Sequence, residues 1–457
     1  MTPVRNLLLF LCHGLRSDAV SDEHRWPLTT PHLRDLAHRG LRVVASSASP
    51  CDPSGRVSLL TGLHARQHGW LGCDLPMPSV HGSIPLWLKQ AGYRVAGVGQ
   101  VSAFEDVLDH AVVTRGEAAS AGHGRDRACR YLAEVGACGL ADAVVKQRRQ
   151  ARRHGPWAVD RLLLEPDQDI DGYIAAEAER MVHGLDDDRP WAVIVAFSGP
   201  GNALPPPPMY AELADASELA FDFVPAKATS IDTLADPTVP RARLQNLTRA
   251  AVGRLRADYL GRVALVDFGI GRVQRAAQAR ADANRTWTVV ASDRGTLLGE
   301  HGLIGDRSFL SETLETPLIV AGPEGGAAPK SHYLDALVST VDVAPTVARL
   351  GQCDVPQGLP GRSLVDAFGD ALHRRGHGGP PAHPCNLAEL PDRLMLETER
   401  HKLILAMPDG RPLALFDLLH DPGERRNLLE LPRQHEVLGP LRQRLAEALL
   451  PMRAAAF

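Results

Sequence analysis

The chain has 457 residues, of which 44% are hydrophobic and 23% are charged, and these proportions are ordinary for a globular protein. They exclude a chain that is disordered throughout and a fibrous repeat. Its 50 Lys and Arg side chains are balanced by 54 Asp and Glu side chains, so the net charge of −4 gives no electrostatic reason to expect a nucleic-acid partner.

Short apolar segments alternate with helical segments over most of the chain. The residues expected in strands are 6–12, 41–45, 93–98, 191–197, 287–291 and 317–321, and those expected in helices are 30–40, 84–92, 170–184 and 244–281. Strands that alternate with helices are typical of βαβ units. The pattern therefore predicts an α/β fold, with a large central, mostly parallel sheet sandwiched by helices.

The predicted domain organisation has three parts. Residues 1–365 form the α/β domain, residues 366–390 form a linker, and residues 391–457 form a small C-terminal subdomain of antiparallel sheet and helix. The linker is expected because residues 369–384 are rich in Gly, Pro and His. The subdomain's predicted elements are strands at 394–397, 401–406 and 414–418 and a final helix at 432–450.

Cysteine usage and hydropathy indicate a cytoplasmic protein. The seven cysteines show no CxxC spacing, and an odd number cannot all pair, so they are expected to be reduced thiols. The apolar segment Leu7–Cys12 is shorter than the core of a signal peptide, and no stretch reaches the ~20 apolar residues that span a membrane. The basic segment Lys146–His154 is expected to be a solvated helix face. We therefore expect neither a membrane nor a nucleic acid as a partner.

The most informative motif lies in residues 49–69 (SPCDPSGRVSLLTGLHARQHG). It resembles the signature of the sulfatase family, in the alkaline phosphatase superfamily, which reads Cys-x-Pro-Ser-Arg, three residues, and Leu-Thr-Gly. Other segments that resemble the family lie in the family's order at residues 6–18, 287–322, 339–364 and 402–428. The resemblance covers nearly the whole chain and implies an alkaline-phosphatase-like fold.

The resemblance implies a hydrolase of sulfuric esters that uses a modified cysteine and a metal. In the family, a Cys becomes formylglycine, whose hydrate attacks the sulfur atom. A divalent metal, usually calcium, binds this nucleophile and the ester oxygens, and three or four carboxylate or amide oxygens hold it. Lys and His side chains neutralise the sulfate and protonate the leaving group.

Most positions of the family's metal ligands and catalytic cations differ in this chain. Where the family has two adjacent Asp, this chain has His13-Gly14, and where the family has Gly-Lys-x-His, this chain has Gly99-Gln100-Val101-Ser102. The family's Asp-Pro-His is replaced by Gly199-Pro200-Gly201, and its Ser-Asp-His/Asn-Gly is replaced by Ser292-Asp293-Arg294-Gly295. Asp306 stands in place of the family's Lys after Gly-Glu-His-Gly. Asp293 is the expected metal ligand that remains. Arg294 places a fixed positive charge where the cation is expected, so Arg294 or Arg56 is predicted to pair with Asp293 in a structural ion pair.

The position of the nucleophile depends on the direction of counting. Counted forward from Cys51, Gly55 stands where the family has Arg. Counted back from Leu-Thr-Gly, Arg56 is in register and Asp52 takes the position of the nucleophile. Formylglycine at Cys51 is therefore not favoured, and Asp52 is a conceivable carboxylate nucleophile.

Two functions remain open. The first is a non-catalytic pseudo-sulfatase with an eroded metal and nucleophile site, acting as a partner subunit, as a homo-oligomer or as an anion-binding module. The second is an active hydrolase or transferase of sulfuric or phosphoric esters with a rewired metal site. Its catalytic candidates are Cys51, Asp52 and Arg56, and its candidate ligands for calcium or a transition metal are Asp293 and His13.

An anion-binding cleft fits the first function. A sulfate- or phosphate-bearing small molecule is the ligand that basic and polar cleft residues would take. The residues expected in this cleft are Arg294, His301, Arg307, Gln100 and Ser102.

Overall fold

The structure is a computed structural model of the chain. The residues that it describes are 5–20, 26–71, 82–114, 130–186, 188–201, 204–219, 222–227, 233–323, 332–365, 383–431 and 435–454.

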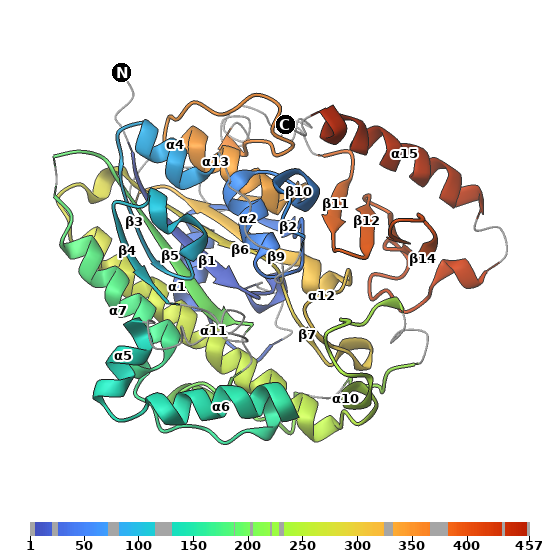
Figure 1. The fold of residues 1–457 in the computed structure, drawn as a ribbon, viewed down its shortest axis with the longest axis horizontal. Helices are drawn as coiled ribbons and strands as arrows, with labels where there is room; N and C mark the ends of the chain where they lie inside the picture. Colours follow the sequence, from blue (N-terminus) through green and yellow to red (C-terminus); the bar gives the residue numbers. More distant parts are fainter. Residues whose placement is uncertain are drawn as a thin grey trace.

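A large twisted sheet runs through the centre of the molecule (Figure 1). Among the described residues it has eight strands, in the order β10 (His332–Ser339), β2 (Gly40–Ser46), β9 (Glu315–Ala321), β6 (Thr286–Ser292), β1 (Asn6–His13), β5 (Trp191–Pro200), β3 (Arg94–Gly99) and β4 (His110–Val113). Strand β9 runs antiparallel to both of its neighbours, and the other neighbouring pairs are parallel. The predicted mostly parallel sheet is therefore confirmed, with two edge strands, β4 and β10, that were not predicted.

Side chains of the central strand β1 alternate between two hydrophobic layers. Leu8 and Phe10 pack on the face that carries α1, α7 and α11, and Leu7 and Leu9 pack on the face that carries α2, α4 and α13. A strand that buries both faces needs apolar residues at nearly every position, which explains the unbroken apolar run of residues 7–12. The sheet is thus covered by helices on both sides (Figure 1).

The bounds of the helices agree with most of the predicted ones. They are α1 (Pro31–His38), α2 (Ser54–Thr61), α3 (Ala65–His68), α4 (Ile84–Gln90), α5 (Arg130–Ala137), α6 (Ala141–His154), α7 (Ile170–His183), α8 (Pro208–Ala211), α10 (Arg241–Gln245), α11 (Arg249–Gln278), α12 (Ser311–Leu314), α13 (Val343–Leu350) and α15 (His435–Ala454). The single helix predicted at 244–281 is wrong at its start, because Thr248 adopts an extended conformation and accepts a hydrogen bond from the Ala251 amide as the N-cap of α11. The basic residues Lys146 and Arg149 on α6 are exposed, as expected.

The C-terminal subdomain is a four-stranded antiparallel sheet covered by α15. Its strands are β11 (Asn386–Glu389), β12 (Arg393–Glu397), β13 (His401–Ala406) and β14 (Pro412–Asp417). The predicted linker 366–390 is wrong at its end, because residues 386–389 pair with β12 as β11; residues 366–382 lie outside the described part of the chain. One face of this sheet packs against Leu441 and Leu445 of α15. In the described part of the chain, no helix combines the length and apolar character that a membrane crossing requires.

A buried lysine joins the C-terminal subdomain to the α/β domain. The Lys402 side chain is fully buried, and its Nζ lies 2.7 Å from Oε1 of Glu424 and 3.5 Å from Oε1 of Glu397. It also donates a hydrogen bond of 3.1 Å to the Ser311 hydroxyl, on α12 of the α/β domain. Burial would lower the pKa of Lys402, but the two carboxylates raise it above its ordinary value, so the ammonium group stays charged at this junction.

We expect Lys402→Met to destabilise the protein by about 3–5 kcal/mol, because it leaves buried Glu424 without its cation. The free energy of unfolding in urea measures this loss. The double variant Lys402→Met/Glu424→Gln removes both charges and should recover part of it. A single variant that loses less than about 1 kcal/mol would show that the pair does not hold the junction.

Candidate active site

Five side chains meet near the carboxyl ends of β1 and β6, the edge where open α/β sheets bind their ligands. His13 ends β1, Asp293 and Arg294 follow β6, Arg56 lies in α2, and Asp52 precedes that helix. We call these five residues the Asp293 cluster. All of them except Asp52 are buried, and Asp52 is partly exposed.

Hydroxyl groups fix the backbone on which the Asp293 cluster is built. The Ser47 hydroxyl donates a hydrogen bond of 2.6 Å to the carbonyl oxygen of Asp293. The Ser292 hydroxyl accepts one of 2.9 Å from the Leu15 amide and donates one of 2.8 Å to the carbonyl oxygen of Arg294. These bonds tie the ends of β1 and β6 together, so the cluster rests on rigid strands rather than on a free loop.

The carboxylate of Asp293 is the centre of the cluster. Its Oδ2 lies 2.7 Å from Nδ1 of His13 and 3.2 Å from Nη2 of Arg56, and its Oδ1 lies 3.9 Å from Nη1 of Arg294. Burial would raise the pKa of Asp293, but His13, Arg56 and Arg294 together lower it well below its ordinary range. The predicted pairing of an arginine with Asp293 is confirmed, and the closer partner is Arg56.

Arg294 is held by an acidic partner and by the imidazole of His13. Its Nη2 lies 2.5 Å from Oδ2 of Asp306 and 2.9 Å from Nε2 of His13. A guanidinium group only donates hydrogen bonds, so Nε2 of His13 accepts this one. With its proton on Nδ1, His13 then donates to Asp293, and the guanidinium nitrogens of Arg56 and Arg294 that lie 3.3 Å and 3.1 Å from Nδ1 are neighbours without a hydrogen bond to it. Burial would lower the pKa of Arg294, but Asp306 and Asp293 raise it, so Arg294 is a permanent internal cation.

Arg56 connects the cluster to two further strands of the sheet. Its Nη1 donates a hydrogen bond of 2.6 Å to Oε1 of Gln100, the residue after β3. The amide nitrogen of Gln100 in turn donates one of 2.9 Å to the hydroxyl of Ser198 on β5. Gln100, which the resemblance places at the family's Lys position, therefore serves as an acceptor for Arg56.

Two glycines close the remaining space at the ends of β1 and β5. Gly14 has φ of +77°, and a Cβ atom added to it would lie 2.6 Å from Cα of Gly201. A Cβ atom added to Gly201 would lie 2.9 Å from Cα of Gly14, and the Gly201 amide donates a hydrogen bond of 2.7 Å to the His13 carbonyl oxygen. By the resemblance, these are positions of a metal-binding Asp and of a catalytic His. The backbones approach so closely that neither position has room for a side chain.

The structure brings some predicted site residues together and separates others. His13, Asp52, Arg56, Asp293, Arg294 and Gln100 lie together, as the distances above show. Cys51 is buried in the hydrophobic core, and Ser102 is exposed at the start of the short helix η2 (Ser102–Val107). His301 lines a separate cavity. The predicted roles of these residues stay predictions.

The predicted cleft included Arg307 and left out Asp306, but the structure places Asp306 against the Asp293 cluster. Asp306 contacts Arg294, whereas the backbone of Arg307 contacts Asp236 and Arg393. A signal for this pair was present in the sequence. The chain has a cation at the family's metal-ligand position and an anion at the family's Lys position, and two such reversals of charge suggest a pair.

The side chains of the Asp293 cluster do not fit the family's calcium centre. Candidate ligand atoms of His13, Asp52 and Asp293 lie within 4.8 Å of one another. However, two of them, Nδ1 of His13 and Oδ2 of Asp293, are hydrogen-bonded to each other. Calcium takes about six to eight oxygen ligands, and two carboxylates supply few of them. A divalent cation beside two guanidinium groups would also be repelled by several kcal/mol.

The structure also favours Asp52 over Cys51 at the position of the family's nucleophile. Asp52 offers a carboxylate oxygen within 4.8 Å of the ligand atoms of His13 and Asp293, whereas the Cys51 side chain packs into the core. The arrangement does not fit formylglycine at Cys51, and Arg56 is therefore in register with the family's Arg.

Comparisons with known proteins agree with this fold. The model of the Sulfatase family matches residues 5–352, and the model named "N-sulphoglucosamine sulphohydrolase, C-terminal" matches residues 299–450. The chain therefore belongs to the sulfatase family, in the alkaline phosphatase superfamily. The predicted family and fold are confirmed.

Individual relatives match over nearly their whole length. An arylsulfatase of Clostridium perfringens is 20% identical over 97% of this chain and 94% of its own. A choline-sulfatase of Rhizobium meliloti is 25% identical over 98% of this chain and 86% of its own. The crystal structure of a phosphonate monoester hydrolase of Agrobacterium radiobacter superposes with a TM-score of 0.79 at 20% identity, over 99% of this chain and 96% of that one. At this identity, the structural match shows the shared fold.

We expect Asp293→Asn to destabilise the protein by about 3–5 kcal/mol, because it leaves two buried guanidinium groups short of a counter-charge. The pKa of Asp293 is lowered in the folded state, so its contribution is present above the unfolded pKa of about 4 and is lost as the pH falls further. Urea unfolding at a series of pH values should show the gap between wild type and variant shrinking below that pH. The exposed Asp335→Asn variant is the control and should show no such gap. A loss below about 1 kcal/mol at neutral pH would contradict the central role of Asp293.

We expect Gly14→Ala to cost more stability than Gly92→Ala. Both glycines have positive φ, at +77° and +87°, but a Cβ atom at Gly92 meets nothing within 4 Å. The control should therefore lose only the roughly 1–2 kcal/mol of backbone strain, and Gly14→Ala should lose this plus the cost of separating two strand ends. Equal losses in urea unfolding would show that the contact with Gly201 is relaxed easily.

Proposed function

We propose that this member of the sulfatase family is a non-catalytic pseudo-sulfatase, which binds a partner and does not hydrolyse sulfuric esters. The observation that carries the proposal is the position of Arg294. Its guanidinium group stands at a metal-ligand position of the family, within 3.1 Å of Nδ1 of His13 and 2.5 Å of Asp306. The cluster contains its own cation where the family's chemistry uses a metal.

The balance of charges supports a structural role for the cluster. Arg56 and Arg294 face the carboxylates of Asp293, Asp306 and Asp52, which all lie within or beside the cluster. A site that binds sulfate or phosphate needs a surplus of positive donors. No surplus exists in this set, so we favour a partner-binding role over the anion-binding role. The Lys and His that would assist the leaving group are replaced by Gln100, Ser102 and Gly201.

Relatives with sulfatase names support the family assignment, and the proposal concerns the departure from them. The partner is expected to be another protein or a second copy of this chain. We place the protein in the cytoplasm because Cys12, Cys138, Cys353 and Cys385 are thiols.

A second candidate is a hydrolase or transferase with a rewired metal site. It is favoured by one observation, the approach of His13, Asp52 and Asp293 to within 4.8 Å. One imidazole and two carboxylates are ligands that zinc accepts. Binding would require the hydrogen bond between His13 and Asp293 to break and both guanidinium groups to move away.

We expect purified wild-type protein to contain no stoichiometric divalent metal by elemental mass spectrometry, and to leave 4-nitrophenyl sulfate and 4-nitrophenyl phosphate intact. We further expect Arg294→Asn to bind zinc at least about tenfold more tightly than wild type, because it removes a fixed charge from the ligands. Arg307→Asn is the matched control, since it removes a neighbouring arginine from outside the cluster. Near one equivalent of metal in wild type, lost in Asp293→Ala, would overturn the pseudo-sulfatase and favour the second candidate.

A further inference from the structure

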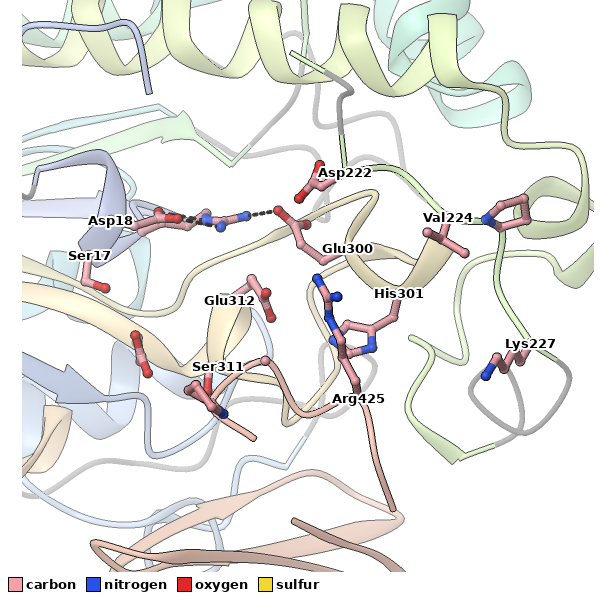
Figure 2. A pocket seen from close by; sticks show the side chains of 15 residues that line it. Ser17, Asp18, Asp222, Val224, Lys227, Glu300, His301, Ser311, Glu312 and Arg425 are labelled. Carbon is pink, nitrogen blue, oxygen red and sulfur yellow. Dashed lines mark hydrogen bonds and ion pairs between the residues drawn. The ribbon is translucent and has the colours of Figure 1, made fainter. Parts of the chain in front are cut away.

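A cavity of about 650 Å³ lies between the α/β domain and the C-terminal subdomain (Figure 2). Its walls come from the turn after β1, the segment 222–227, the short helix η8 (Glu300–Gly302), α12 and the turn that contains Pro422 and Arg425. Its lining residues are different from those of the Asp293 cluster. The volume lies within the range of about 300–1,000 Å³ that is typical of small-molecule sites.

Carboxylates outnumber basic groups on the cavity wall. The lining carboxylates are Asp18, Asp222, Glu300, Glu312 and Glu315, and the lining basic side chains are Arg16, Lys227, His301 and Arg425. Arg16 is bound to Asp18 at 2.7 Å and to Glu300 at 2.8 Å. The buried Arg256, behind the wall, is bound to Asp222 and lies 3.5 Å from Glu300. Asp18, Asp222 and Glu300 therefore each have an internal arginine as a partner, with Glu300 shared between the two arginines.

Glu312, on α12, is the carboxylate whose hydrogen bonding the protein leaves incomplete. Its Oε2 is closed off from solvent and has no hydrogen-bond partner among the described residues, although the side chain lines the cavity and lies beside Ser311 and Arg425 in Figure 2. Burial raises the pKa of Glu312, the facing Glu300 and Glu424 raise it as well and Arg16 lowers it, with a net result of about 7. A buried acceptor without a donor is costly. The side chain is partly exposed and lines the cavity, so a cation held there would stabilise the carboxylate from its exposed side.

Glu315 adds a second carboxylate to the same wall. It is the first residue of β9, and solvent reaches it. Partial desolvation of its carboxyl group in the cavity, together with the neighbouring carboxylates, still raises the pKa of Glu315 above its ordinary value. The charged groups that face Glu315 are Lys402, Glu397, Glu424 and Asp18. Lys402 is already bound to Glu424 at 2.7 Å, so it does not supply a dedicated cation to Glu315.

The spacing of the lining carboxylates favours an organic cation over a bare metal ion. Among the described residues, three metal-ligating side chains come within 4.8 Å of one another only at His13, Asp52 and Asp293. The carboxylates of the cavity are therefore too dispersed to surround one ion. An amine that donates hydrogen bonds from a carbon skeleton can instead reach separate carboxylates and fill the volume. Lys227 and Arg425 are exposed, and buried Arg16 is already paired with Asp18 and Glu300.

We propose that this cavity is a binding site for a small organic amine, whose ammonium group donates to Glu312 and whose charge is shared with Glu315. The proposal does not depend on whether the Asp293 cluster is catalytic, because it uses none of the cluster's side chains. The proposal therefore places a positively charged ligand at the junction of the two domains.

The test is isothermal titration of the full-length protein with 1,4-diaminobutane at pH 8 and pH 6. We expect binding at pH 8 and roughly tenfold weaker binding at pH 6, because a carboxyl group with a pKa of about 7 must lose its proton first. The uncharged analogue 1,4-butanediol should not bind, and calcium chloride should not compete. Binding should also release protons near pH 7, which is seen as a heat that depends on the buffer.

Glu312→Gln is expected to weaken binding at pH 8 at least tenfold and to flatten the pH dependence. Glu315→Gln is a second variant, which should weaken binding and keeps the test decisive if Glu312→Gln does not fold. The exposed Glu399→Gln variant is the matched control and should bind as wild type does. No binding at pH 8, equal binding of the diol, displacement by calcium, or full binding by both Gln variants would overturn the proposal.

Discussion

Asp293 carries a negative charge inside the protein, and the neighbouring structure is arranged around the need to balance it. A buried carboxylate without a partner is several kcal/mol less stable than one that is paired. In a metal enzyme a bound cation can supply that balance. Here Arg56 supplies the positive charge, His13 donates a hydrogen bond, and Arg294 adds a second cation from the adjacent position of the chain. The family's acidic residue is therefore balanced by side chains of the chain itself.

The other departures from the family pattern are consistent with this arrangement. A cation at position 294 requires an anion, and Asp306 provides it from the loop that follows η8. Glycine at position 14, where the family has Asp by the resemblance, allows the ends of β1 and β5 to approach each other. Gln100 accepts from Arg56 where a second cation would have repelled it. These substitutions therefore fit together as one set of interactions, and they are less well explained as independent losses of catalytic residues.

Much of the fold could be predicted from the sequence, because β1, β5 and β6 are buried on both faces and read as unbroken apolar runs. Strands β4 and β10 escaped prediction because they lie at the sheet's edges, where β4 is only four residues long and His332 and Asp335 interrupt the apolar pattern of β10. In the site, the pairing of Asp293 with an arginine followed from charge alone, and the structure decides for Arg56 as the closer partner. The reversed charges at positions 294 and 306 suggest a pair, but the displacement of Cys51 into the core depends on how the segment before α2 folds in space.

The contact between Gly14 and Gly201 has a consequence for the history of this protein. Each glycine removes the room that the other position would need for a side chain. Restoring an aspartate at one of them alone would meet the backbone of the other, so a single reverting mutation gains no ligand and loses stability. The two strand ends would have to move apart first. If the site is non-catalytic as proposed, the contact between these two backbones makes a return to the family's metal-binding pattern by one substitution unfavourable.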